Sequence, residues 1–407
     1  MIKKAFKYIR IMLNPVAFER DRAKLQASVK KKDRKIEALQ VKVEKKDRRI
    51  EALQGKVEKK DRQIEKKDRQ IEALQSIVMA SRSISPYMLS ERFQANGKPN
   101  IELTALQVEM KNQIETKVKQ GIYPFEKVPC CVCGGQKFEA LSEKDRYGLY
   151  APVVICVGCG LVQTNPRMTE EAYQQFYEIE YSKLYIGVDN PHDYHFNKLY
   201  KRGRRIYDYI EQSLEAQLNQ SRILEVGCSS GGILQYFKEQ GNQVRGCDFN
   251  PETVRFGRDR YNLELQVGTI YDITLSWRPD IVIYSHVLEH ILNPVEELEK
   301  VRSIMAENAI LYIEVPGIKH ISKQYDFDLL SYLQNAHVYY FTLTTLKNLL
   351  KKAGFDFIHG DEFIRSIFRV AAEPQQNTRI ENDYEAVIKF LRMFEDTLKE
   401  MVVSQKL

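Results

Sequence analysis

Apolar residues recur at every seventh position between residues 29 and 79, within the charged repeat Lys-Lys-Asp-Arg-x-Ile-Glu. One heptad position is β-branched and the position three later is often leucine: Val29, Ile36, Val43, Ile50, Val57, Ile64, Ile71 and Val78, then Leu39, Leu53 and Leu74. This pattern predicts a coiled coil over residues 21–80 and favours a parallel homodimer. Lysines fill three of the leucine positions (Lys46, Lys60 and Lys67), so a single solvated helix remains the alternative.

A shorter helical pattern precedes the heptads. Ile2, Phe6, Ile9 and Leu13 fall on one face of a helix predicted over residues 1–20. Residues 1–24 contain seven Lys or Arg and two acids. A basic amphipathic helix can bind an anionic membrane surface, and packing against its own protein is the alternative.

The stretch Ile223–Leu234 has a third pattern, in which an apolar run ends in a glycine-rich turn and helical spacing follows. Gly227 and Gly231 allow close approach of the backbone to a ligand. The free N–H groups at the helix start favour a polar acceptor. Asp248 ends the next short strand, where a carboxylate can accept hydrogen bonds from both hydroxyls of a ribose.

Four more strands are predicted downstream from their apolar runs. They cover 280–284, 310–315, 354–358 and 367–372, and the last two read as an antiparallel pair. An amphipathic helix is expected over Leu343–Lys352. The fold class is therefore α/β.

The spacing Glu225-x-Gly227-x-Ser229-x-Gly231 differs from the dinucleotide fingerprint G-x-G-x-x-G. It resembles motif I of the class I S-adenosylmethionine (SAM) methyltransferases, E/D-x-G-x-G-x-G, and residues 287–290 resemble the V-L-E-H segment of that family. The resemblance implies a Rossmann-like SAM domain, which we assign to residues 168–375. It places SAM against Glu225, Gly227, Cys228, Gly231, Asp248, Phe249, Gly268, Thr269, Ser285 and His286.

Two Cys-x2-Cys-Gly sequences lie before this domain. Their cysteines can supply four thiolates to one tetrahedral, structural zinc: Cys130, Cys133, Cys156 and Cys159. Cys131 would be a spare. The zinc-binding module is predicted over residues 126–167, after a linker with a helix over residues 81–125 (helix Leu103–Lys119). A C-terminal helix is predicted over residues 376–407.

Methyl transfer requires alignment of donor and acceptor, exclusion of water and removal of a proton from the acceptor. A neutral histidine is a suitable base for a hydroxyl. The candidates are His337, His290 and His286, with Glu289 beside them. A helix is expected to begin at His286, so Glu289 and His290 are alternatively structural. The tyrosines between residues 173 and 185 are interpreted as packing residues of the domain junction, and lining of a substrate cavity is the alternative.

Residues 335–342, Asn-Ala-His-Val-Tyr-Tyr-Phe-Thr, resemble the H-x-x-Y-F-S/T segment that sugar methyltransferases place over the acceptor. The paired cysteine knuckles and residues 161–167 resemble the zinc module of the same enzymes. Ala336 stands where deoxysugar C-methyltransferases have a glutamate. We therefore favour methylation of a sugar or glycan hydroxyl. The alternatives are C-methylation of a nucleotide-linked deoxysugar and a membrane-associated scaffold with a non-catalytic SAM-binding domain.

The predicted coiled coil and the basic helix together resemble the architecture of enzymes that methylate the end of a bacterial surface polysaccharide. This resemblance implies a glycosyltransferase as a further partner. The formal net charge is +7. The charges in the heptads alternate in sign, however, which argues against a nucleic-acid-binding run there. Tyr284-Ser285-His286-Val287 replaces the N/D-P-P-Y/F motif of nucleic-acid amino-methyltransferases, so we expect no nucleic-acid partner. The sequence shows neither a signal peptide nor a run of ~18 apolar residues. We expect a cytoplasmic protein, peripheral on the inner face of the membrane if the basic helix binds it.

Overall fold

The computed structural model of the chain describes residues 89–186, 192–372 and 380–404, together with Glu19 and Arg22. The chain divides into two compact units, Met1–Ser83 and Ile84–Leu407. The helix predicted over 1–20 and the coiled coil predicted over 21–80 lie outside the described residues, except that Glu19 and Arg22 are helical and form an exposed ion pair. No helix within the described residues combines the length and the apolar character needed to cross a membrane.

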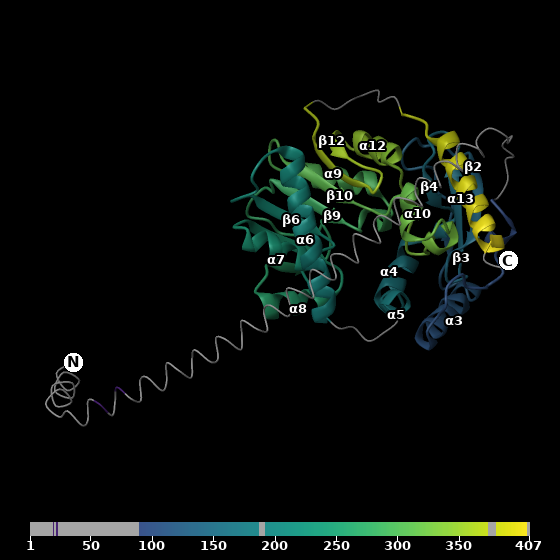
Figure 1. The fold of residues 1–407 in the computed structure, drawn as a ribbon, viewed down its shortest axis with the longest axis horizontal. Coiled ribbons are helices and arrows are strands. Elements are labelled where there is room, and N and C mark those ends of the chain that lie inside the picture. Colours follow the sequence, from purple (N-terminus) through teal and green to yellow (C-terminus); the bar gives the residue numbers. More distant parts are fainter. Residues whose placement is uncertain (1–18, 20–21, 23–88, 187–191, 373–379, 405–407) are drawn as a thin grey trace. The chain divides into compact units, whose positions relative to one another are not determined.

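A seven-stranded sheet organises much of the second unit (Figure 1). Its strand order is β12-β13-β10-β9-β6-β7-β8, and β13 runs antiparallel to both of its neighbours. The other pairings are parallel. The strands are β6 (Arg222–Val226), β7 (Gln243–Asp248), β8 (Leu265–Val267), β9 (Ile281–Ser285), β10 (Ile310–Glu314), β12 (Phe355–Gly360) and β13 (Arg365–Val370). The predicted strands and their closing antiparallel pair are confirmed, with ends shifted by one to two residues.

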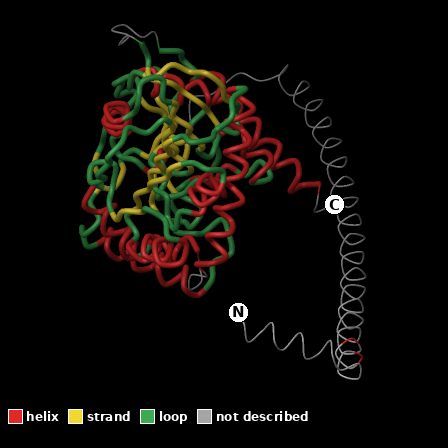
Figure 2. The backbone as a smooth tube through the Cα atoms, turned by 90° about the vertical axis from the view of Figure 1, so that its left-hand side faces the viewer, coloured by secondary structure: helices red, strands yellow, loops and turns green. Residues whose placement is uncertain are grey.

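Helices cover both faces of this sheet, as its continuous apolar runs require. Alternate residues of each strand enter different cores, so Ile223 and Leu224 pack on opposite sides. One core includes side chains of α6 (His192–Leu214), α7 (Gly232–Glu239) and α8 (Pro251–Tyr261). The other includes side chains of α9 (Pro294–Ile304) and α12 (Leu343–Lys352). The bounds of α12 are those predicted from the sequence. Figure 2 shows the strands enclosed by helices.

Two glycines bring α6 and α7 together. A Cβ on Gly232 would lie 2.5 Å from the carbonyl oxygen of Phe196, and a Cβ on Gly203 would lie 2.9 Å from the Cα of Ile233. Neither position has room for a larger residue. This contact fixes α6 beside the first turn of α7, directly after the glycine-rich loop.

A second, antiparallel sheet has the order β11-β4-β3-β2. Its strands are β2 (Phe138–Lys144), β3 (Tyr150–Cys156), β4 (Val162–Thr164) and β11 (Tyr339–Tyr340). The strands β1 (Phe125–Glu126) and β5 (Arg167–Met168) pair separately. Three strands of the four come from the segment that carries the cysteines, whereas β11 comes from the region assigned to the SAM domain. The two parts are therefore joined through a shared sheet.

Shorter elements complete the unit: η1 (Glu91–Phe93), α3 (Ala105–Lys119), α4 (Glu170–Ile179), α5 (Tyr181–Ile186), η2 (Leu288–His290), η3 (Ile318–His320), α10 (Ile321–Gln324), α11 (Leu329–Tyr332) and α13 (Tyr384–Ser404). Helix α3, predicted from Leu103, begins at a capping box between Thr104 and Gln107. The start of α13 packs on the second cysteine knuckle, where the N–H of Asp383 donates to the carbonyl oxygen of Cys159 (3.2 Å).

Arg92 in η1 links the start of this unit to α13. Its Nε and Nη2 atoms donate to Glu395 Oε2 at 2.9 and 2.7 Å, and its Nη1 donates to Asp328 Oδ1 at 2.7 Å. The Glu395 side chain is only 4% exposed. Arg92 is therefore the main cation beside this carboxylate. Its other partners are Lys399, at 3.8 Å, and the Ser90 hydroxyl.

We predict that Arg92→Met lowers the free energy of unfolding by about 2–3 kcal/mol, because it leaves a buried carboxylate without its main cation. Urea denaturation measures this loss. Arg204→Met is the matched control, because Arg204 and Asp208 form an exposed pair at 3.8 Å, and it should cost less than about 0.5 kcal/mol. Equal midpoints for the two variants would contradict the prediction.

Candidate active site

The candidate site lies where the chain leaves the sheet in opposite directions. β6 pairs with β7 on one side and with β9 on the other, which makes the carboxyl ends of β6 and β9 the topological switch point. The loop after β6 contains the glycine motif, and the loop after β9 contains His286–His290. The two loops touch, because a Cβ on Gly227 (φ +69°) would lie 2.3 Å from Val287 Cγ2. Glycine is therefore required at position 227.

Asp248, at the end of β7, organises the glycine loop. Its Oδ2 accepts from the N–H of Ser229 (2.7 Å) and its Oδ1 from the N–H of Asn250 (2.9 Å). Burial raises the pKa of Asp248, and the hydrogen bonds from Asn250 and Ser229 oppose this shift. Each carboxylate oxygen keeps a second lone pair that can accept from a hydroxyl. The arrangement fits a ribose while holding Ser229 at a φ of +49°.

Glu225 and Arg202 provide opposite charges beside the same loop. The Glu225 side chain is buried, and its Oε2 has no hydrogen-bond partner. Burial and the charge of Asp248 raise the pKa of Glu225, whereas the charge of Arg202 lowers it. The Nε of Arg202, on α6, is also buried without a partner. These groups fit the ammonium and carboxylate of an amino acid such as the methionine part of SAM. Arg202 was not predicted from the sequence, because no motif surrounds it.

The other residues predicted to contact SAM differ in burial and in their hydrogen-bond partners. The Cys228 thiol is buried next to Gly246, so only its backbone can face a ligand. The N–H of Gly268 donates to the Asp248 carbonyl oxygen (3.0 Å), and the Thr269 hydroxyl donates to Asp272 (2.8 Å). Phe249 is 71% exposed. Ser285 donates to Glu314 (3.4 Å).

His286 lies between two carboxylates. Its Nδ1 is 3.7 Å from Glu289 Oε1 and its Nε2 is 3.8 Å from Glu314 Oε1. Burial lowers the pKa of His286, but Glu289 and Glu314 outweigh burial and raise it to about 9. His286 is therefore charged at neutral pH and poorly suited to accept a proton. Glu314, at the carboxyl end of β10, was not selected from the sequence.

Glu289, His290 and His337 form a second group. The helix expected at His286 is instead a single 3₁₀ turn, η2, and α9 begins only at Pro294. This turn directs both Glu289 and His290 toward the loop of His337, where the two imidazole rings meet edge to face with centroids 4.8 Å apart. Burial, followed by the charge of His290, lowers the pKa of His337 well below its usual range. His337 is therefore neutral at pH 7.

Two tyrosines of α4 and α5 contact this group. The Tyr177 hydroxyl lies 3.0 Å from His290 Nδ1, and the ring centroids of Tyr177 and Tyr181 are 6.2 and 6.3 Å from that of His290. Tyr185 accepts from the N–H of Ala336 (3.2 Å). The packing interpretation thus covers only part of their role. The four-residue spacing from 173 to 185 could have indicated an aromatic face, but not what it covers.

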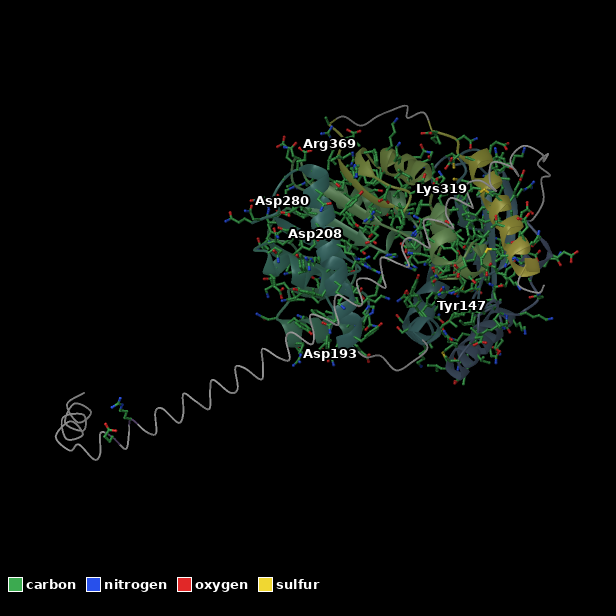
Figure 3. All side chains as sticks on the ribbon, in the orientation of Figure 1. Tyr147, Asp193, Asp208, Asp280, Lys319 and Arg369 are labelled. Carbon is green, nitrogen blue, oxygen red and sulfur yellow. The ribbon has the colours of Figure 1, made fainter. Side chains whose placement is uncertain are left out.

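The loop of His337 is held by the small sheet. The Thr164 hydroxyl of β4 donates to the carbonyl oxygen of His337 (2.9 Å), and Asp145 Oδ2 accepts from the N–H of Asn335 (3.0 Å). On the other side, the N–H of Val338 donates to the carbonyl oxygen of Glu289 (2.8 Å). In Figure 3, Tyr147 of the small sheet's region and Asp280, which precedes β9, lie on opposite sides of the unit. The small sheet therefore closes the carboxyl end of the large one.

The four predicted cysteine ligands also come together. The Sγ atoms of Cys130 and Cys159 are 3.4 Å apart, as are those of Cys133 and Cys156, and all four lie within 4.8 Å of one another. Cys131 is not part of this group. Four thiolates at such separations are compatible with one tetrahedral zinc, whose Zn–S bonds are about 2.3 Å.

The strand order and the groups beside the glycine loop together define a class I methyltransferase fold. Residues 199–359 match the family described as "Methyltransferase domain". This part of the chain is a SAM-dependent methyltransferase domain.

Individual proteins are similar to this chain over shorter stretches or at low sequence identity. The chain is 24% identical over 131 residues to an "Uncharacterized methyltransferase" of Staphylococcus carnosus, a match that covers 31% of this chain and 61% of that protein. The match thus spans about three-fifths of the relative. Similar solved structures include a S-adenosylmethionine-dependent methyltransferase from Clostridium acetobutylicum (12% identity, 49% of this chain and 99% of that one, TM-score 0.35). Another is the amino pentose methyltransferase CalS10 from Micromonospora echinaspora (14% identity, 44% and 95%, TM-score 0.33).

Proposed function

We propose that this protein transfers the methyl group of SAM to a hydroxyl group of a sugar or glycan. One observation supports this assignment above all. A neutral, buried histidine, His337, lies in the loop before β11, next to Glu289 and His290 of the turn that follows β9. Such a group suits an acceptor that must lose a proton, which a hydroxyl does when it is methylated.

In this proposal, different residues of the chain bind the cofactor and assist removal of the acceptor proton. SAM supplies an electrophilic methyl group when bound. Asp248 holds the ribose, and Glu225 and Arg202 hold the charged methionine end. The histidine group assists loss of the acceptor proton, with His337 as the candidate acceptor of it. Tyr177 and Tyr181 lie against His290 and keep water from that side of the group.

Oxygen rather than carbon is the favoured acceptor because of Ala336. Its side chain is a buried methyl group, and its carbonyl oxygen is used by His290 Nδ1 (2.9 Å). The carboxylate that the deoxysugar C-methyltransferases place there is therefore missing from this position. C-methylation of a nucleotide-linked deoxysugar remains the second candidate. A scaffold role without catalysis is disfavoured by the retained Asp248 and His337.

The heptads would add an assembly role to this activity. We propose that residues 21–80 pair two chains in parallel, as a rod or spacer for an enzyme acting on the end of a surface polysaccharide. Light scattering should give a dimer for the full chain and a monomer for a chain beginning at residue 84. A dimer in both cases would place the interface outside the heptads.

We predict that Asp248→Ala weakens SAM binding by about 1.5–3 kcal/mol, because charge-assisted hydrogen bonds to the ribose are lost. Isothermal calorimetry measures the dissociation constant. Asp259→Ala removes an exposed carboxylate from the neighbouring helix α8 and should bind SAM normally. An unchanged affinity in Asp248→Ala would refute the ribose assignment.

We predict one structural zinc per chain on the four clustered cysteines. Cys156→Ser should lose the metal and lower the melting temperature, because the remaining thiolates no longer close a tetrahedron. Elemental analysis measures zinc content. Cys131→Ser is the matched control, since Cys131 lies outside the group, and it should retain the metal. Zinc-free wild-type protein would contradict this prediction.

We predict that His337→Gln lowers kcat by about 10²–10⁴-fold, the usual contribution of general-base assistance, while SAM affinity stays nearly unchanged. Labelled SAM with a panel of sugar acceptors provides the assay. His359→Gln, on the exposed side of β12, controls for loss of a histidine. Wild-type turnover by His337→Gln would show that His337 only packs.

A further inference from the structure

Glu289, His290 and His337 place three metal-ligating side chains together at the end of β9. Their ligand atoms all lie within 4.8 Å of one another. The side chains of Glu289 and His337 are 1% and 5% exposed, respectively. They come from two segments far apart in the chain, η2 and the loop before β11, so the fold rather than local sequence assembles them.

The buried carboxylate of Glu289 has no hydrogen bond. Neither of its oxygens has a hydrogen-bond partner, although the charged His286 lies near Oε1, and the Nδ1 atom of His337 also lacks a hydrogen-bond partner. The nearest basic nitrogens, on His286 and His290, are 3.7 and 3.8 Å from Oε1, which is longer than a hydrogen bond. Buried polar groups are normally satisfied, and a buried carboxylate is especially costly when it is not. A cation between these side chains would satisfy all of them.

The orientation of His290 gives independent support. Its Nδ1 is 2.9 Å from the carbonyl oxygen of Ala336. A carbonyl only accepts, so Nδ1 carries the proton and the neutral ring has its lone pair on Nε2. This Nε2 is 3.8 Å from Glu289 Oε1. Both atoms are then acceptors, and a cation between them would satisfy both. Metal-ligating histidines typically donate their other N–H to a backbone carbonyl in this way.

We infer that Glu289, His290 and His337 bind one divalent transition-metal ion. Two imidazoles and one carboxylate suit manganese, iron, cobalt or zinc better than magnesium or calcium, which prefer oxygen ligands. Ligands bound at about 2.0–2.2 Å lie closer together than 4.8 Å, so binding draws the three side chains inward. Three protein ligands leave coordination positions open for water and substrate.

The inference rests on the proposed function for its role and refines it. An acceptor hydroxyl at an open position would be deprotonated more readily. Its proton passes to solvent, its oxygen bonds to the methyl carbon, and the electrons of the broken carbon–sulfur bond remain on sulfur. His337 is then a ligand rather than the proton acceptor. Adjacent hydroxyls of a sugar could occupy two open positions, which would select for a diol.

Binding of Mn²⁺ to the full chain, without SAM or acceptor, tests the inference. Mn²⁺ prefers oxygen and nitrogen ligands to thiolates, so the cysteine group does not compete. Protein is stripped with a chelator, its cysteine group is refilled with one equivalent of Zn²⁺, and the sample is titrated with Mn²⁺ while free Mn²⁺ is followed by electron paramagnetic resonance. We expect one ion per chain in the wild type and in His359→Gln. Glu289→Gln, His290→Gln and His337→Gln should each weaken binding at least tenfold.

A measurement on the wild type keeps the test valid if a variant fails to fold. Electron spin echo of the Mn²⁺-loaded protein should show coupling to directly bound histidine nitrogens. No bound Mn²⁺, no nitrogen coupling, or unchanged binding in folded Glu289→Gln would overturn the inference and leave a protonated His290–Glu289 pair instead. Because neither experiment uses methyl transfer, a failed metal site and a failed methyltransferase assignment are distinguished.

Discussion

The pairing of β11 with β4 is the constraint on which the site depends. Tyr339 and Tyr340 align with Gln163 and Val162, so a two-residue strand is held by a sheet formed earlier in the chain. His337 lies two residues before this strand and is fixed from the same sheet by the Thr164 hydroxyl. Without this pairing, the loop would depend on contacts outside the small sheet, such as the Val338 N–H on the carbonyl oxygen of Glu289 and His290 Nδ1 on the carbonyl oxygen of Ala336. The small sheet is therefore a structural part of the active site.

The cysteine group reaches the site through the same sheet. Cys156 is the last residue of β3. Its N–H donates to the carbonyl oxygen of Leu161 (2.8 Å), the residue directly before β4. Closure of the four thiolates around an ion would therefore fix the turn between β3 and β4, and with it the register of β4 against β11. A structural metal at the knuckles would thus position His337 through two strands. Its role would be geometric, since the link runs through the backbone hydrogen bonds of β3 and β4.

The sequence predicted those features that depend on periodic patterns over many residues. Six of the seven strands of the large sheet, the helix α12 and the four clustered cysteines follow from apolar runs, amphipathic spacing and paired motifs, and these are present. The three-residue strand β8 was not predicted. The position of β11 could not be predicted in this way, because two tyrosines in an aromatic run carry no periodicity. Arg202 was missed for a related reason, and Tyr177 was named but favoured as a packing residue. Their contacts depend on which helices lie over the carboxyl ends of β6 and β9, and tertiary packing decides that.

The charges around β9 suggest that this region serves chemistry rather than stability. Glu289, Glu314 and His286 are grouped at the carboxyl end of the sheet at distances of 3.7 to 3.8 Å, where direct hydrogen bonds are not formed. Apolar residues of similar size would fill this space at lower cost. Backbone strain accumulates at the same place, since Ser229 and His286 both have positive φ angles, of 49° and 58°. Strain and buried charge are retained together mainly where a ligand uses them. Both loops that carry this cost meet at Val287 and Gly227, so the glycine loop and the group of Glu289, His290 and His337 form one continuous candidate site.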